Sequence, residues 1–193
     1  MNLTAYFDQA LNYNDYLKKI GQQLLELENG DDPYDYAQYY SINLKRIDRL
    51  NKNHELSDKQ IDKLSKIKTD FRLLTISEGW CGDAAQIVPV VEKIANAMAV
   101  EHRIVFRDEQ PELMDAFLTN GSRSIPIIIG LNENGEEIFR FGPRPAEAME
   151  LLKKAKENPE GYDADQFHKD LQVWYNKDKG NSIFDELYEL ITK

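Results

Sequence analysis

Cysteine is the scarcest chemically informative residue here: Cys81 is the only one among 193 residues. A chain with one cysteine forms no internal disulfide, and a cysteine-rich zinc or iron–sulfur site within one chain is excluded. Any disulfide must therefore form with another molecule. The three histidines, His54, His102 and His168, lie far apart in the sequence. We expect all three on the solvated surface, and we predict no metal site and no cofactor.

Basic charge and long apolar runs are also lacking. Lys and Arg number 24 against 34 Asp and Glu, and the resulting net charge of −10 repels nucleic acid and anionic membrane surfaces. We therefore expect neither as a partner. No apolar run approaches the roughly 18 residues of a membrane span, and residues 1–8 have neither the basic segment nor the apolar stretch of a secretory signal. We expect a cytoplasmic protein.

The most informative stretch is residues 71–95. An apolar run with β-branched members at 71–77 is followed by a glycine-containing turn, and helical apolar spacing begins at Ala84. This pattern predicts a strand, a tight loop and a helix, with Cys81 where the helix begins. Free backbone N–H groups and the helix dipole favour an anion there. We therefore expect Cys81 to be partly exposed and to ionise more readily than a free thiol.

Motifs along residues 68–157 resemble those of the thioredoxin family. Trp80-Cys81-Gly82 resembles the start of its Trp-Cys-Gly-Pro-Cys motif, and Pro89 falls where thioredoxins kink the next helix. Ser124-Ile125-Pro126 is similar to the cis-proline loop, and residues 127–129 to the strand after it. Asn134-Gly135 fits the hairpin turn, and Gly142 fits the glycine after the last strand.

The resemblance implies an α/β, thioredoxin-like fold: a central mixed sheet with helices on both faces. Residues 68–157 form this core. Helical apolar spacing also marks residues 1–67 and 158–193, which we interpret as helical N-terminal and C-terminal extensions packed on the core. Ser57 and Gln60 have the spacing of a capping box, and a helix from about Pro33 to Leu50 is predicted.

Three positions depart from the family pattern. Ala84 replaces the second cysteine, Asp83 replaces the usual proline, and Thr75 replaces a buried acid that serves the second cysteine. A mixed disulfide at Cys81 would therefore need an external thiol to resolve it. Asp83 has two possible roles: its negative charge is favourable at the positive end of the helix dipole, or it donates a proton to a leaving thiolate. In either role its carboxylate raises the pKa of the Cys81 thiol and so opposes ionisation.

The predicted site has Cys81 as its catalytic nucleophile and Trp80, Gly82, Asp83, Ile125 and Pro126 as substrate-binding residues. The resemblance implies that the Ile125–Pro126 bond is cis and that Ile125 offers backbone groups to an extended substrate. The residues alone also allow a second interpretation, in which Pro126 is a proline at the start of a strand and has no further role.

Other residues near the expected site allow two interpretations. Arg123 and Arg144 either flank the mouth of the site or are solvated charges. Seven of the ten tyrosines lie in the first 40 residues, and they form either a packing face or a groove near Cys81. We expect residues 33–50 to pack near the Cys81 loop and to narrow access to it.

Two functions follow. The first is a monothiol oxidoreductase that acts through Cys81 on a protein or small-molecule disulfide and uses an external thiol as reductant. The second is a redox-inactive binding module that recognises peptides or proteins through the cis-proline groove. A cluster-binding, glutaredoxin-like dimer fits poorly, because Trp80 and Asp83 are not of that pattern.

Overall fold

The protein is built on one four-stranded mixed sheet. A computed structural model describes residues 1–158 and 160–193. The strands are β1 (Arg72–Ser77), β2 (His102–Phe106), β3 (Ile127–Leu131) and β4 (Glu137–Phe141), in the order β2-β1-β3-β4. β1 runs parallel to β2 and antiparallel to β3, and β3 pairs antiparallel with β4. This is the predicted mixed sheet.

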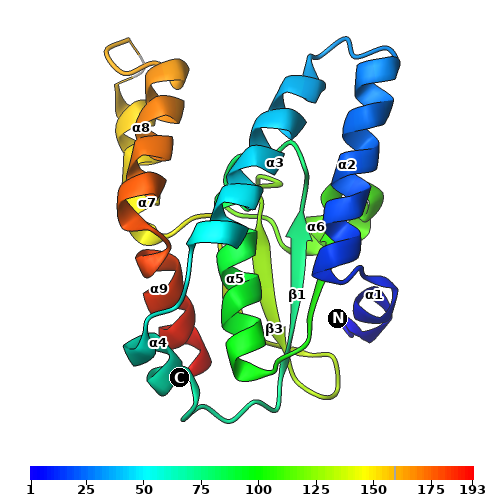
Figure 1. Cartoon of the computed structure of the whole chain (residues 1–193), viewed down its shortest axis with the longest axis vertical. Coiled ribbons are helices and arrows are strands. Elements are labelled where there is room, and N and C mark those ends of the chain that lie inside the picture. Colours follow the sequence, from blue (N-terminus) through cyan, green and yellow to red (C-terminus); the bar gives the residue numbers. More distant parts are fainter. Residues whose placement is uncertain (159) are drawn as a thin grey trace.

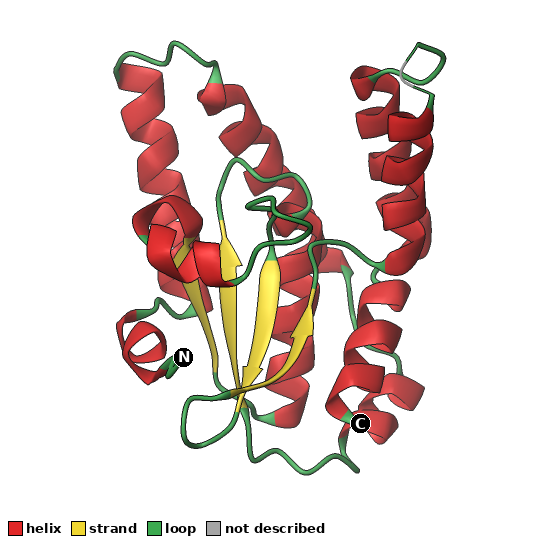
Figure 2. Ribbon diagram, turned by 180° about the vertical axis from the view of Figure 1, so that it is seen from behind, coloured by secondary structure: helices red, strands yellow, loops and turns green. Residues whose placement is uncertain are grey.

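Helices surround the sheet (Figures 1 and 2). The N-terminal ones are α1 (Thr4–Gln9), α2 (Tyr13–Asn29), α3 (Tyr36–Asn53) and α4 (Asp58–Leu64). The central ones are α5 (Ala84–Met98), the short 3-10 helix η1 (Arg107–Glu109) and α6 (Pro111–Ala116). The C-terminal ones are α7 (Ala146–Glu157), α8 (Ala164–Asp178) and α9 (Asn181–Ile191). No helix in the described part of the chain is long and apolar enough to cross a membrane.

The central position of β1 fixes the two ends of the molecule. In the register, Ile76 lies opposite Ile127 and Arg72 lies opposite Leu131. The loop after β1, which carries Cys81, is therefore at one end of the sheet, and the β3–β4 hairpin is at the other. In Figure 1 the helical pairs α2–α3 and α7–α8 both rise past the end of β1 where that loop lies.

The terminal helices share the core of the sheet. Phe7, Tyr16 and Ile20 are buried in one apolar cluster with Leu74 of β1, whereas Phe184 lies in the other cluster with strand residues. The segment before α2 also pairs with the sheet edge. The Leu11 N–H donates to the Ile104 carbonyl at 2.9 Å, and the Ile104 N–H donates to the Leu11 carbonyl at 2.7 Å. The N-terminal helices are thus packed directly on the sheet.

Local sequence signals are mostly confirmed, with one shifted helix start. Ser57 and Gln60 form the predicted capping box, and Gly135 takes the positive φ of a hairpin turn. α3 begins at Tyr36 rather than near Pro33. Asp35 has a left-handed backbone, and the Asp32 carboxylate accepts hydrogen bonds from the Tyr36 and Ala37 N–H groups. The first turn is therefore capped from a loop that contains Pro33.

The prediction of three surface histidines is wrong for His102, which is only 7% exposed. Its Nε2 lies 2.8 Å from the Thr75 hydroxyl, and its Nδ1 lies 2.9 Å from a Glu92 carboxylate oxygen. The central sheet buries both His102 and Thr75, and each satisfies the other's polar group. His168 is exposed, as expected, whereas His54 is half-buried.

Candidate functional site

Cys81 lies in the last turn before α5, facing the loop that precedes β3. The Cys81 thiol donates to the Ile125 carbonyl at 3.4 Å, and the Ala84 N–H donates to the sulfur at 3.4 Å. The Ile125–Pro126 bond is cis. The predicted meeting of Cys81, Ile125 and Pro126 is therefore present. The predicted exposure is wrong, because Cys81 is only 7% exposed and both loop residues are buried.

The electrostatic prediction for Cys81 is also wrong. Burial, and after it the charge of Asp83, raises the pKa of the Cys81 thiol to about 12. Hydrogen bonds from backbone N–H groups and the positive charge of Arg144 act in the opposite direction, but more weakly. The helix start does favour the thiolate, as expected. Desolvation outweighs it, so the resting group is a protonated thiol.

Asp83 is the centre of a buried polar cluster that the sequence did not reveal. One carboxylate oxygen lies 2.6 Å from Nη2 of Arg144, which follows β4, and the other accepts a hydrogen bond of 2.8 Å from the Tyr175 hydroxyl. Burial, followed by the Asp83 charge, raises the pKa of Tyr175 well above its ordinary value. The C-terminal extension therefore reaches the candidate site. Tyr175 follows ordinary helical spacing in α8, so no sequence signal marks it.

The two arginines that were expected beside the entrance of the Cys81 site, Arg123 and Arg144, lie in different environments. Arg144 is largely buried against Asp83 and neutralises it. Arg123 makes two 2.7 Å hydrogen bonds to the carboxylate of Asp115 on the surface. The interpretation as a solvated charge therefore holds for Arg123. Neither interpretation holds for Arg144, which is largely buried and paired with Asp83 instead of lying free at the entrance of the site.

Helix α3 covers the Cys81 loop, as predicted for residues 33–50. The Asn43 side-chain amide donates to the Gly79 carbonyl at 2.9 Å. A Cβ on Gly79 would lie 2.5 Å from the Tyr40 ring, so glycine is needed for this approach. A Cβ on Gly82 would lie 3.2 Å from Nη1 of Arg46. The loop is therefore held between α3 and the sheet, which explains the burial of Cys81.

Trp80 lies among aromatic and charged side chains near the start of α3. The Arg107 guanidinium lies 4.5 Å from its ring centroid, and the Tyr36 ring lies 6.2 Å away. Both Trp80 and Tyr36 line a cavity of about 250 Å³ with the buried Glu78. Burial raises the pKa of Glu78 to about 7. Both interpretations of the tyrosines hold in part: some pack in the core, and Tyr36 and Tyr40 line this cavity.

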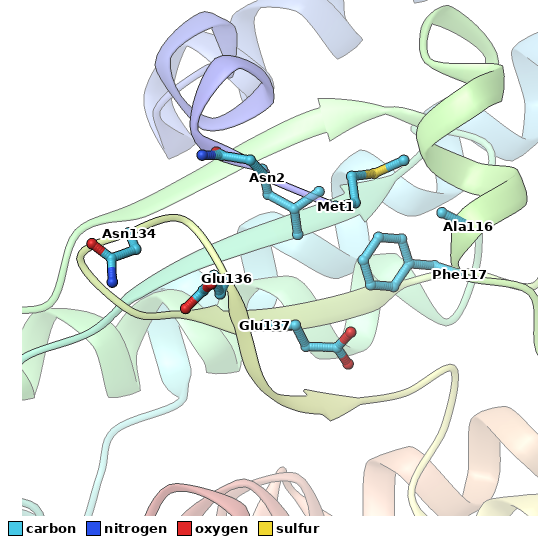
Figure 3. A pocket seen from close by; sticks show the side chains of 8 residues that line it. Met1, Asn2, Ala116, Phe117, Asn134, Glu136 and Glu137 are labelled. Atoms are coloured by element: carbon cyan, nitrogen blue, oxygen red, sulfur yellow. The ribbon is translucent and has the colours of Figure 1, made fainter.

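One cavity lies away from Cys81. It measures about 610 Å³ and lies at the hairpin end of the sheet, where the Leu3 N–H donates to the Gly135 carbonyl. Figure 3 shows Met1 and Asn2 of the N-terminus beside Glu136 and Glu137 of the hairpin. Nothing in this cavity belongs to the predicted site, which the register places at the opposite end.

The comparison with protein families gives a decisive match: the model of a family described as thioredoxin matches residues 30–156. The chain belongs to the thioredoxin family. The matched range includes α3 as well as the strands and α5, so this thioredoxin-family match extends beyond the segment from which the sequence resemblance came. The family assignment therefore rests on more than the residues around Cys81.

Two solved structures have the same fold. A protein of unknown function from Pseudomonas aeruginosa is 16% identical, with a TM-score of 0.65 over 96% of this chain and 94% of that one. An HIV epitope-scaffold is 15% identical, with a TM-score of 0.65 over 100% of this chain and 98% of that one. A search of curated proteins found no match. At these identities the structures show the fold alone, although the likeness includes the terminal helices of this thioredoxin-family chain.

Proposed function

We propose that this thioredoxin-family protein exchanges thiols and disulfides through Cys81 alone. The observation that carries the proposal is the placement of the sulfur: it receives the Ala84 N–H at the start of α5 and touches the carbonyl of Ile125 beside the cis-proline. A thiolate formed there meets a positive helix end on one side and backbone groups for an extended substrate on the other.

The reaction has two exchanges. The Cys81 thiolate attacks one sulfur of a substrate disulfide, a Cys81–substrate disulfide forms, and the other sulfur leaves as a thiolate that takes up a proton. Ala84 has no sulfur to attack this adduct. A thiolate from an external thiol then attacks the substrate sulfur and forms a disulfide with it, and Cys81 leaves as a thiolate and is protonated. The substrate disulfide is the oxidant and the external thiol is the reductant.

The resting state makes the first exchange slow at neutral pH. Because burial raises the pKa of Cys81 to about 12, very few molecules carry the thiolate at pH 7. The thiol must also leave the Ile125 carbonyl, because it donates to that group. We therefore expect the rate of mixed-disulfide formation to rise about tenfold for each pH unit from 7 to 10.

The second candidate function is a binding module without redox chemistry. The burial of Cys81 and its raised pKa favour it, because both work against a nucleophile. In this candidate the thiol is a fixed donor that holds the Ile125 loop in place. Cys81→Ser would then preserve partner binding, since a hydroxyl also donates to a carbonyl.

Mixed-disulfide capture separates the two functions. The protein is incubated with excess 2-hydroxyethyl disulfide at pH 7, 8, 9 and 10, and intact mass is followed against time, with Cys81→Ser as the control. The exchange proposal predicts a single adduct on the wild-type protein, a rate that follows pH, and release of the adduct by added thiol. It also predicts no turnover of insulin in a thioredoxin reductase cycle. A native protein that forms no adduct at pH 10 would contradict it.

A further inference from the structure

Three cations gather beside the Cys81 loop, in a protein whose net charge is −10. Lys45, Arg46 and Arg49 come from α3, and they line a cavity of about 330 Å³ between α3, α5 and α8. Its other polar lining consists of the amide side chains of Gln86, Gln172 and Asn176. No carboxylate is among the described residues that line this cationic pocket. The Gln86 amide N–H donates to the Gln172 amide oxygen at 2.8 Å, so the amides of Gln172 and Asn176 are the neutral donors that could supplement the three cations at an anion.

The positive charge of the pocket is not neutralised within the described residues. None of Lys45, Arg46 and Arg49 has a carboxylate within 4.0 Å in that part of the chain. Arg46 donates to the Asn43 amide oxygen at 2.8 Å. Arg49 donates to the amide oxygens of Asn176, at 2.5 Å, and Gln86, at 3.3 Å. Their hydrogen bonds therefore go to neutral groups, which leaves the charges available to a ligand.

Arg46 is the partly buried cation of the pocket, and its charge is the one that an anion would stabilise most. Partial burial, and after it the neighbouring Arg49, lowers the pKa of Arg46, while the charge of Asp83 acts in the opposite direction. The close contacts of the Asp83 carboxylate are with Arg144 and Tyr175, so it acts on Arg46 only from a distance. A bound carboxylate or phosphate would offset the repulsion between the two arginines, and a planar guanidinium suits both anions.

The pocket borders the reactive loop. A Cβ on Gly82, the residue after Cys81, would lie 3.2 Å from Nη1 of Arg46 and 3.7 Å from Nε2 of Gln172. The missing side chain of Gly82 therefore leaves the loop backbone directly against the pocket wall. Two residues that line the pocket, Arg46 and Gln172, therefore contact the residue that follows Cys81.

We propose that the cationic pocket binds the anionic group, a carboxylate or a phosphate, of the small thiol or disulfide that exchanges with Cys81. The anion-binding part stands on the pocket alone, whereas the exchange part rests on the proposed function. Electrostatic attraction concentrates such a ligand beside the loop, and it weakens as ionic strength rises.

Binding is tested on Cys81→Ser, so that no exchange takes place. Calorimetric titrations use S-methylglutathione for carboxylates, coenzyme A for phosphates, and neutral 2-mercaptoethanol as the control ligand. We expect at least one anionic probe to bind, and the one that binds identifies the anion. Adding Lys45→Glu and Arg49→Glu together should weaken that binding at least tenfold. Lys52→Glu, on the same helix but outside the pocket, should leave it unchanged.

Two results would overturn the pocket: no binding of either anionic probe to a folded protein, or equal binding after both charge reversals. These variants are expected to fold, because Lys45 and Arg49 are exposed, and single Lys45→Gln and Arg49→Gln variants provide milder versions. If a probe binds but the wild-type protein forms no mixed disulfide, the proposed function fails and the pocket stands. If mixed disulfides form but no probe binds, the pocket fails and the function stands.

Discussion

Asp83→Asn should make Cys81 more reactive and the protein less stable. The change keeps the shape of the side chain but removes the negative charge that, after burial, raises the pKa of the thiol most. It also leaves Arg144, whose charge favours the thiolate, without its carboxylate partner at 2.6 Å. Both consequences act in the same direction on Cys81.

The size of the effect follows from charge interactions at short range. A charge within about 4–6 Å typically shifts a pKa by about 1–3 units. From a starting value of about 12, Asp83→Asn should bring the pKa of Cys81 to about 9–11. Thiolate-dependent alkylation at pH 8 should then be about 10 to 1000 times faster. Breaking the largely buried ion pair should cost about 3 kcal/mol of unfolding free energy.

The assay is iodoacetamide alkylation measured by mass spectrometry from pH 7 to 11, combined with urea unfolding. Tyr175→Phe is the matched control, because it removes one hydrogen bond from the same carboxylate and leaves its charge. That variant should lose about 1 kcal/mol of stability without lowering the pKa of Cys81. An Asp83→Asn protein that is alkylated at the wild-type rate at every pH from 7 to 11 would refute the electrostatic account. Equal acceleration in Tyr175→Phe would point to loosening of the site instead.

Two further predictions concern the surroundings of the site. Burial raises the pKa of the Glu78 carboxyl from 4.5 to about 7, so the folded protein binds the carboxyl proton more tightly than the unfolded chain does. The free energy of unfolding should therefore fall by up to about 3 kcal/mol as the pH rises from 4.5 to 7. In urea unfolding at pH 5 and 8, Glu78→Gln should lose this decrease, and an unchanged slope would contradict the assignment. Deleting residues 1–56 should abolish cooperative folding, because Tyr16 and Tyr40 are buried in the core cluster and Asn43 holds the Cys81 loop. If the remaining chain melts as before and Cys81 is alkylated at the same rate, the N-terminal helices form an independent domain.

The sequence alone determined the features that depend on local patterns. Apolar periodicity located the strand before Cys81 and the helix after it, and the turn chemistry of Asn134-Gly135 located the hairpin. Counting cysteines showed that any disulfide must join a second molecule. These inferences succeed because strand, helix and turn preferences act over a few neighbouring residues. The resemblance then supplied the meeting of Cys81 with Pro126, which lie 45 positions apart in the numbering.

Only the tertiary structure decided the state of the site. Cys81 was expected to ionise readily because its local position is a helix start, yet α3 covers its loop and desolvation raises its pKa. Asp83 was known to oppose ionisation, but its partners Arg144 and Tyr175 come from distant segments. Burial and charge pairing depend on which remote elements pack together, and local sequence preferences do not specify that. For the same reason the sequence did not reveal that Thr75 and Glu92 are the hydrogen-bond partners of His102.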